Sequence, residues 1–139
     1  MEITLLHATP KAKVDIILRE GLRAASAFND LGIPMRRGVV YCWLRREHDK
    51  MWGNNTDYTY IEVTVDRSRC RVADMEWSSL ALMYLQGNLK PEHSEAASLL
   101  ARLYEVTAVS LDNYREGMFF TPEVLVSGDV SANKLAPVD

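Results

Sequence analysis

The chain has 139 residues, of which 47% are hydrophobic and 25% are charged, and its formal net charge is −3. This length and composition predict one soluble globular domain over residues 1–139, with enough apolar side chains for a core. The acidic balance excludes a globally basic nucleic-acid binder. A local basic patch stays open, built from arginines that could equally lie on solvated loops and strand ends: Arg36, Arg37, Arg45, Arg46, Arg67, Arg69 and Arg71.

Two features predict a cytoplasmic protein without membrane contact. Cys42 and Cys70 have neither the spacing of metal ligands nor a disulfide framework around them, which favours a reducing compartment. The first residues lack the basic region and long apolar stretch of a signal peptide, and no apolar run is long enough to span a bilayer.

The first third of the chain predicts a strand, a helix and a loop. Residues 3–7 read as a short strand that leads directly into a helix, with Thr9 as the N-cap and Pro10 at the first helical position. An apolar stripe at helical spacing follows, and Gly21 is placed to end the helix. Residues 24–37 have mixed polarity with Gly and Pro, so we expect a loop that could cover a site.

The middle of the chain predicts further strands and a helical region. Residues 45–52 form one or two helical turns, and residues 75–104 form two helices separated by a break at 87–90, the second beginning near Pro91. Three segments read as strands: residues 38–44, 58–65 and 70–72. The apolar stripes of the helices are Trp77, Leu80, Ala81 and Tyr84 on the first, and Ala96, Leu99, Leu100 and Leu103 on the second.

The final third returns to strands. Residues 105–109 and 123–126 read as strands, residues 112–121 as the loop before the second of them, and the segment from Val130 to Pro137 as an edge strand. Because strands and helices are mixed without strict alternation, we expect the α+β class and not a doubly wound sheet.

Three chemically capable side chains lie in or at the end of predicted strands: His7, Tyr41 and Glu123. His7 stands where the first strand ends, so it can donate and accept hydrogen bonds at the mouth of a cleft. Tyr41, which shares a strand face with Trp43, could stack with Trp52 on one planar ligand. Glu123 opens an apolar strand, where an ionised carboxylate needs a partner or solvent. For each residue a structural role is the alternative.

No other chemistry competes with this set. The sequence has no phosphate-binding Gly-rich loop, no serine in a strand-turn-helix elbow and no paired histidines at metal spacing, so we expect no metal site. His48 and His93 lie on charged stretches and are expected to be solvated.

The three segments resemble the His-Tyr-Glu signature of the ADP-ribosyltransferase superfamily, which includes the catalytic domains of poly-ADP-ribose polymerases and the toxin-type DNA ADP-ribosyltransferases. His7-Ala8-Thr9 resembles the family's His-Gly-Thr strand end, and residues 17–23 resemble the helix end that follows it. Residues 38–41 resemble the Gly-x-x-Tyr strand, and residues 123–130 resemble the strand of the catalytic Glu and its turn. The resemblance implies an α+β fold with a split mixed β-sheet core and a few flanking helices.

The resemblance implies an NAD-dependent mono-ADP-ribosyltransferase, which cleaves the nicotinamide glycosidic bond and transfers ADP-ribose to an acceptor. Catalytic roles would fall to Glu123, His7 and Tyr41, with Glu123 bound to the 2′-hydroxyl of the nicotinamide ribose, where positive charge develops. His7 would contact the adenosine-side ribose, the backbone at Ala8 the carboxamide, and Tyr41 with Trp52 the nicotinamide ring. The implied NAD-binding residues are His7, Ala8, Thr9, Tyr41 and Trp52.

The resemblance also implies that the loop before Glu123 faces the acceptor, through Tyr114, Arg115 and Phe119. Thr121 stands two residues before Glu123, where arginine- or asparagine-modifying toxins carry Glu or Gln. This departure weighs against protein arginine as the acceptor and leaves nucleic-acid bases, other protein side chains, small molecules or water. Among these we favour nucleic acid, because the end of the chain resembles the toxin-type DNA enzymes and the arginines are clustered. A protein acceptor and an antitoxin or regulatory partner stay open.

Two further departures concern the carboxamide pocket. Ala8 replaces the family's Gly, and Asp49 stands near the position of the Ser that holds the carboxamide in polymerase-like members.

Three other interpretations stay open. The chain could be a catalytically inactive module of this fold that binds NAD, ADP-ribose or a protein partner, but such a module has no need of a carboxylate at Glu123. A relative of the RNA 2′-phosphotransferases would need further Arg and His phosphate ligands. In an unrelated α+β domain, His7, Tyr41 and Glu123 would be structural.

Overall fold

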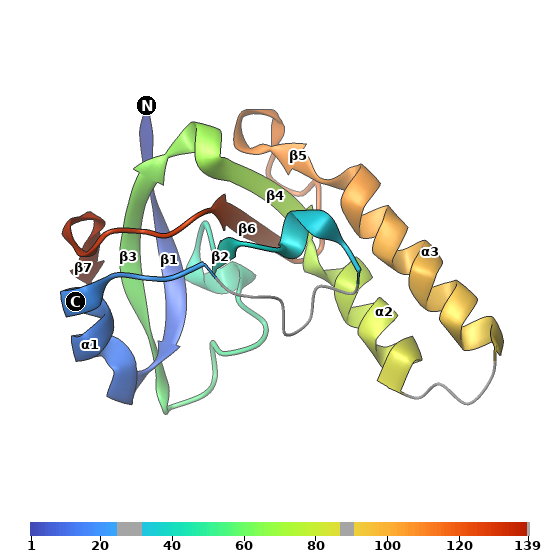
Figure 1. Cartoon of the computed structure of the whole chain (residues 1–139), viewed down its shortest axis with the longest axis horizontal. Coiled ribbons are helices and arrows are strands. Elements are labelled where there is room, and N and C mark those ends of the chain that lie inside the picture. The colour runs from blue at the N-terminus through green and yellow to red at the C-terminus, as the bar shows by residue number, and fades with distance from the viewer. Residues whose placement is uncertain (25–31, 87–90, 139) are drawn as a thin grey trace.

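The computed structural model describes residues 1–24, 32–86 and 91–138, which form two β-sheets flanked by helices (Figure 1). The first sheet contains, in spatial order, β1 (Glu2–Pro10), β3 (Tyr58–Asp66) and β7 (Leu135–Pro137). The second contains β2 (Val39–Cys42), β6 (Pro122–Ser127), β4 (Cys70–Asp74) and β5 (Val109–Ser110). All these strand pairs are antiparallel. The α+β class is therefore confirmed, with two antiparallel sheets in place of the expected mixed one.

Among the described residues, three α-helices accompany the sheets: α1 (Val14–Glu20), α2 (Met75–Gln86) and α3 (Pro91–Thr107). Short 3₁₀ turns are η1 (Lys11–Lys13), η2 (Pro34–Arg36), η3 (Arg46–His48), η4 (Arg67–Arg69), η5 (Leu111–Asn113) and η6 (Ala132–Lys134). The helices α2 and α3 lie side by side at the end of the molecule away from β1 and β3 (Figure 1). Within the described ranges, no helix combines the length and apolar character needed to cross a membrane.

The two sheets are joined by backbone hydrogen bonds between β1 and the end of β2. The N–H of Leu6 donates to the carbonyl of Trp43 at 2.9 Å, and the N–H of Trp43 donates to the carbonyl of Leu6 at 2.7 Å. Elsewhere β1 is an edge strand, paired on its other side with β3 over its whole length. This seam brings His7 beside β2, although the two segments are far apart in the sequence.

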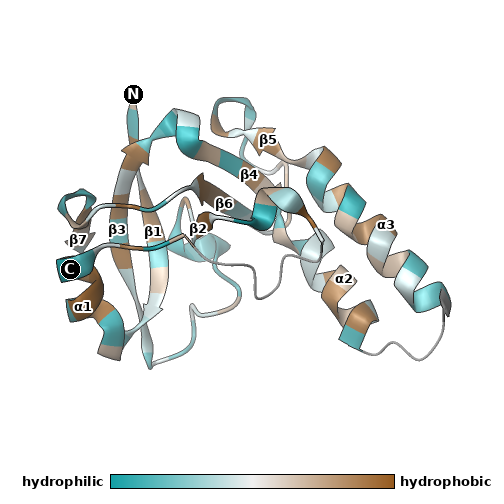
Figure 2. Cartoon of the chain, in the orientation of Figure 1, coloured by the Kyte–Doolittle hydropathy of each residue, from teal (hydrophilic) through white to brown (hydrophobic). Residues whose placement is uncertain are grey.

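Apolar residues along the strands of both sheets build two core clusters (Figure 2). One lies between the sheets and includes Val124 and Val126 of β6. The other lies between the second sheet and α3 and includes Leu125 and Tyr104. Since successive side chains of a strand point to opposite faces, Glu123 shares the face of Leu125 and points toward α3.

The first helix begins later than the sequence predicts. Thr9 is not a helix N-cap but lies inside β1, because pairing with β3 continues to Pro10. Gly21 does end α1, as predicted, with a φ of +90°. A Cβ at Gly21 would stand 2.6 Å from the carbonyl oxygen of Val130, so glycine is required where the chain passes this backbone.

Two expectations about the last helix are wrong. The predicted strand at residues 105–109 is mostly helical, because α3 continues to Thr107 and only Val109–Ser110 pairs with β4. Leu99 of the predicted stripe is exposed, whereas Tyr104, which is not part of that stripe, is fully buried. The helices on either side of the predicted break are confirmed, but the break at 87–90, like residues 25–31 of the predicted loop, lies outside the described residues.

Candidate active site

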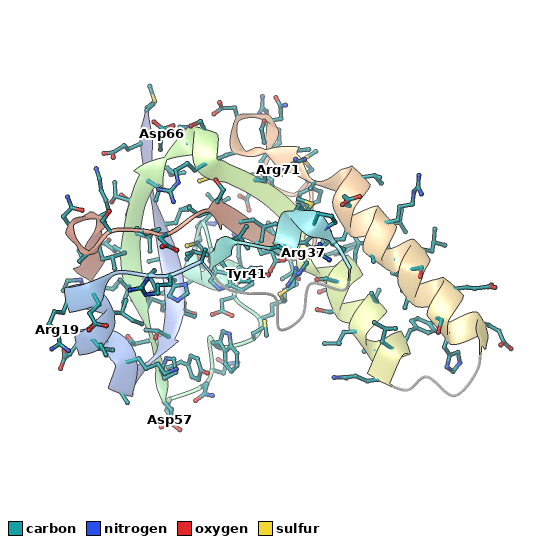
Figure 3. All side chains as sticks on the ribbon, in the orientation of Figure 1. Arg19, Arg37, Tyr41, Asp57, Asp66 and Arg71 are labelled. Carbon is teal, nitrogen blue, oxygen red and sulfur yellow. The ribbon has the colours of Figure 1, made fainter. Side chains whose placement is uncertain are left out.

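One cavity of about 310 Å³ at the junction of the sheets gathers most of the expected site residues. His7 and Ala8 of β1, Tyr41 of β2, Glu123 of β6 and Trp52 all line it. Figure 3 shows Tyr41 near the middle of the molecule, whereas the labelled Arg19, Asp57 and Asp66 lie at its edge. The volume is at the lower end of the range for small-molecule sites.

Glu123 is a buried carboxylate, 4% exposed, and two donors meet at one of its oxygens. The guanidinium of Arg36 donates from Nη1 to Oε1 at 2.6 Å, and the hydroxyl of Tyr104 donates to the same oxygen at 2.5 Å. Among the described residues, no protein donor is assigned to Oε2. The site therefore fixes one oxygen of the carboxylate and leaves the other for a ligand.

Arg36 is held between two aromatic rings, with its guanidinium carbon 4.9 Å from the ring centroids of both Tyr41 and Tyr104. Burial by itself lowers the pKa of Arg36, but the charge and hydrogen bond of Glu123 together with Tyr104 and Tyr41 outweigh it, so the pKa lies above its usual value. Burial, reinforced by Glu123, raises the pKa of Tyr104, so its hydroxyl stays protonated and donates. Sequence reasoning missed both residues.

His7 is held in one tautomer by the backbone of β2. Its Nδ1 lies 2.7 Å from the carbonyl oxygen of Tyr41, and since a carbonyl only accepts, Nδ1 must carry the hydrogen. Burial lowers the pKa of His7, which opposes a second proton on the ring. The neutral ring therefore presents Nε2 as an acceptor, suited to a ligand hydroxyl.

Ala8 offers backbone groups at the free edge of β1. In an antiparallel pair, alternate residues direct their N–H and C=O groups toward or away from the partner strand. Leu6 uses both of its groups on Trp43, away from β3, so Ala8, two residues on, has the same orientation. Its N–H and C=O can therefore meet a group that carries both a donor and an acceptor, such as a carboxamide.

The aromatic residues present ring faces to the cavity. Trp52 stacks on Tyr58 with 4.2 Å between ring centroids and 7° between planes, so one face of the indole is covered. The guanidinium of Arg36 lies over the ring of Tyr41, and the Tyr41 hydroxyl donates to the Arg36 carbonyl at 3.0 Å. Both rings are thus fixed on one side and line the cavity that holds Glu123.

Other expected residues lie elsewhere. Thr9 is buried in β1 and does not line the cavity. Tyr114 and Phe119 pack against each other and the core, with ring centroids 5.9 Å apart. Arg115 donates to the carbonyls of Asp112 and Tyr114, both at 2.9 Å. The segment before β6 therefore folds back onto the protein, and none of its three expected acceptor contacts reaches the cavity.

Asp49, which aligns near the family's carboxamide-binding Ser, shapes the turn that carries Trp52. Its Oδ1 accepts from the N–H groups of Met51 and Trp52, each at 2.9 Å. Its Oδ2 accepts from the hydroxyl of Tyr60 at 2.8 Å, and burial together with Asp49 raises the pKa of that phenol to about 12. The carboxylate thus supports the cavity wall and does not line the cavity.

The expectation that His48 is solvated is wrong, because its side chain is 8% exposed. Its Nε2 accepts from Nη2 of Arg45 at 3.2 Å and lies 3.4 Å from Oε1 of Glu116, a residue that also pairs with Arg45. His93 is partly buried and packs edge-on against Tyr84. Long-range contacts that a charged local sequence does not reveal account for the burial of His48.

Several arginines of the expected basic patch bind within the fold. Arg36 is in the buried ion pair, and Arg67 pairs with Asp112 at 2.9 Å. Arg69 donates to the backbone carbonyls of Ser127 and Asp129.

Across the part of the chain that the structure describes, no group of three or more His, Cys, Asp or Glu side chains could hold a metal ion.

Comparison of the chain with protein-family models, with curated proteins and with solved structures finds no match in any of the three. These comparisons therefore neither support nor contradict the resemblance to the ADP-ribosyltransferases.

Proposed function

We propose that this chain is an NAD-dependent mono-ADP-ribosyltransferase whose catalytic carboxylate is Glu123. The observation that carries the proposal is that His7, Tyr41 and Glu123, from three strands far apart in the sequence, line one cavity. A buried glutamate that is ion-paired yet keeps one oxygen for a ligand is costly to maintain, and strongly coupled groups of this kind are enriched at functional sites.

In this proposal, NAD lies across the junction of the two sheets. Nε2 of His7 accepts a hydrogen bond from a hydroxyl of the adenosine-side ribose, and the outward N–H and C=O groups of Ala8 hold the carboxamide. The nicotinamide ring stacks on Tyr41 and Trp52. Each contact uses a residue that lines the cavity.

The chemistry follows from the charge of Glu123. Oε2 accepts a hydrogen bond from the 2′-hydroxyl of the nicotinamide ribose, while Arg36 and Tyr104 hold Oε1. The bond from the ribose to nicotinamide breaks with its electron pair on the leaving nicotinamide, and the negative carboxylate stabilises the positive charge left on the sugar. Arg36 partly neutralises this negative charge, but it also compensates the free-energy cost of burying an ionised carboxylate.

Replacement of Glu123 by Gln tests the proposal. Gln keeps an oxygen that can accept from Arg36 and Tyr104, so NAD binding should persist, while nicotinamide release should fall by roughly 10²-fold or more. Glu105→Gln, the same change at an exposed carboxylate of α3, is the matched control. Undiminished release by Glu123→Gln would show that the mechanism is wrong.

A non-catalytic module that binds NAD or ADP-ribose is the second candidate function. The contact of Arg36 with Glu123 favours it, since the guanidinium partly neutralises the group that catalysis requires. Calorimetric titration with NAD, combined with a nicotinamide assay, separates the two candidates, because the module binds NAD and releases no nicotinamide.

The finer parts of the proposal concern acceptor and compartment. We propose nucleic acid as the acceptor, which single-stranded oligonucleotides test directly by stimulating nicotinamide release. We propose the cytoplasm as the compartment, which is consistent with two cysteines, Cys42 and Cys70, that are both buried and unbridged.

A further inference from the structure

A second cavity, of about 380 Å³, is lined by residues adjacent in the chain to residues of the Glu123 cavity. Its lining residues include Lys50, Glu76, Trp77, Leu80 and Phe120. The two cavities share the same stretches of chain, because Met51, Met75 and Glu123 line the first. A group bound in the second cavity is therefore a close neighbour of anything bound beside Glu123.

The most exposed aromatic side chain of the described residues stands at this second cavity. Phe120 is 82% exposed, yet its backbone is fastened on both sides. Its N–H donates to Oδ2 of the buried Asp74 at 3.0 Å, and its carbonyl accepts from Nζ of Lys50 at 3.1 Å. Asp74 also accepts from the N–H of Thr121 at 3.1 Å. The backbone of Phe120 is thus fixed by hydrogen bonds while its ring is exposed to solvent at the cavity that the half-buried Trp77 also lines.

Glu76 supplies a carboxylate at the same place. The hydroxyl of Thr121 donates to its Oε1 at 2.7 Å, which fixes Glu76 beside the residue two positions before Glu123. Lys50 contributes an ammonium group whose remaining hydrogens can reach a carbonyl or phosphate oxygen. The cavity therefore combines two aromatic rings with two carboxylates, those of Glu76 and Asp74, and one ammonium donor. Asp74 is already bound to backbone N–H groups, so Glu76 is the carboxylate considered for a ligand.

We propose that this second cavity binds a planar heteroaromatic ring with an N–H edge, a nucleobase, as the acceptor of ADP-ribose. The ring stacks on Phe120 and Trp77, and its N–H groups donate to Glu76. This inference rests on the function proposed above. A flat apolar lining suits a base better than it suits the flexible side chain of a protein Lys or Arg.

The transfer balances with these groups alone. A nitrogen of the base forms a bond to C1′ of the ribose, and the bond from C1′ to nicotinamide breaks with its electron pair on nicotinamide. The proton of the reacting nitrogen passes to the carboxylate of Glu76. The base comes from a free nucleoside or from a single strand, since a base stacked inside a duplex cannot enter a cavity without being flipped out.

Ring binding is tested on the wild-type chain without NAD, by calorimetry with free nucleosides, a single-stranded oligonucleotide and the same oligonucleotide as a duplex. We expect Phe120→Ala to weaken binding about tenfold, because stacking on one aromatic residue contributes about 1–3 kcal/mol per base. Met118→Ala, an exposed side chain of the same segment that does not line the cavity, is the matched control. Wild type should bind a nucleoside more tightly than its N-methylated analogue, and Glu76→Gln should reduce this difference in affinity.

The outcomes separate this inference from the proposed function. Equal binding by Phe120→Ala and wild type, or equal losses in Phe120→Ala and Met118→Ala, would overturn the cavity assignment. Nicotinamide release that depends on Glu123 but is stimulated by polypeptides and not by nucleosides or oligonucleotides would leave the enzyme and overturn the nucleobase acceptor. Ring binding that depends on Phe120, without any nicotinamide release, would overturn the proposed function and the acceptor role while leaving the stacking site.

Discussion

The two ends of the Glu123 cavity control charge in opposite ways. At the end built by β1, His7 is kept neutral, because burial lowers its pKa and its hydrogen-bond partner is the carbonyl of Tyr41, which carries no charge. At the end built by β6, Glu123 is paired with the guanidinium of Arg36 and the hydroxyl of Tyr104. A half-buried histidine is thus a neutral acceptor at one end, and a buried glutamate is part of an ion pair at the other.

The difference shows that the surrounding partners, and not burial alone, decide the charge of a buried group. A backbone carbonyl can only fix a tautomer, whereas a guanidinium compensates a full charge. A dinucleotide such as NAD needs both kinds of contact, a neutral acceptor for a hydroxyl and a negative charge for the reacting sugar. The predictions below change one end at a time.

Arg36→Met should have the largest effect on stability. The change leaves Glu123 buried without a countercharge, and loss of one partner from a buried pair costs about 3–5 kcal/mol. Chemical denaturation monitored by tryptophan fluorescence measures the free energy of unfolding. Arg102→Met, at an exposed position of α3, is the control. A loss no larger than that of Arg102→Met would mean that the ion pair does not form.

Tyr104→Phe should have an intermediate effect at the same end. It removes one hydrogen bond to the charged carboxylate but keeps the ring against Arg36, so we expect a loss of about 1.5–3 kcal/mol in the free energy of unfolding. Tyr84→Phe, at a largely exposed position of α2, should change this free energy little. Equal losses of unfolding free energy in Tyr104→Phe and Tyr84→Phe would show that the Tyr104 hydroxyl does not hold Glu123.

Acidification should have the smallest effect, and it acts on the His7 end. Because the pKa of His7 is lower in the folded chain than its usual value of 6.5, the unfolded chain binds the proton more readily. Stability from this group is therefore complete above pH 6.5 and decreases as the pH falls below it. NAD binding should weaken over the same range, since protonated Nε2 no longer accepts.

Comparing the unfolding free energies of wild type and His7→Gln between pH 7.5 and pH 5.5 isolates this contribution, because every other titratable group is the same in both proteins. The variant should lose less stability on acidification than wild type. An identical pH dependence of unfolding in the two proteins would show that His7 is not held neutral by burial.

The sequence by itself determined the local elements and the order of the expected site residues. Alternation located β3, short apolar runs located β1 and β6, and Gly21 ended the first helix as its backbone conformation requires. Strand patterns and helix stops depend on residues close together in the chain, so they can be read from it directly. His7, Tyr41 and Glu123 were found because each interrupts an apolar strand.

Tertiary structure alone decided how those residues are partnered. Arg36 lies 87 positions from Glu123 in a segment that reads as a solvated loop, and Tyr104 reads as one more apolar helix position. The same holds for Phe120, whose ring stays in solvent because Asp74, 46 residues away, binds its backbone. Periodicity reports which face of an element is apolar, but an ion pair or a clamped backbone depends on two distant segments meeting, and only folding brings them together.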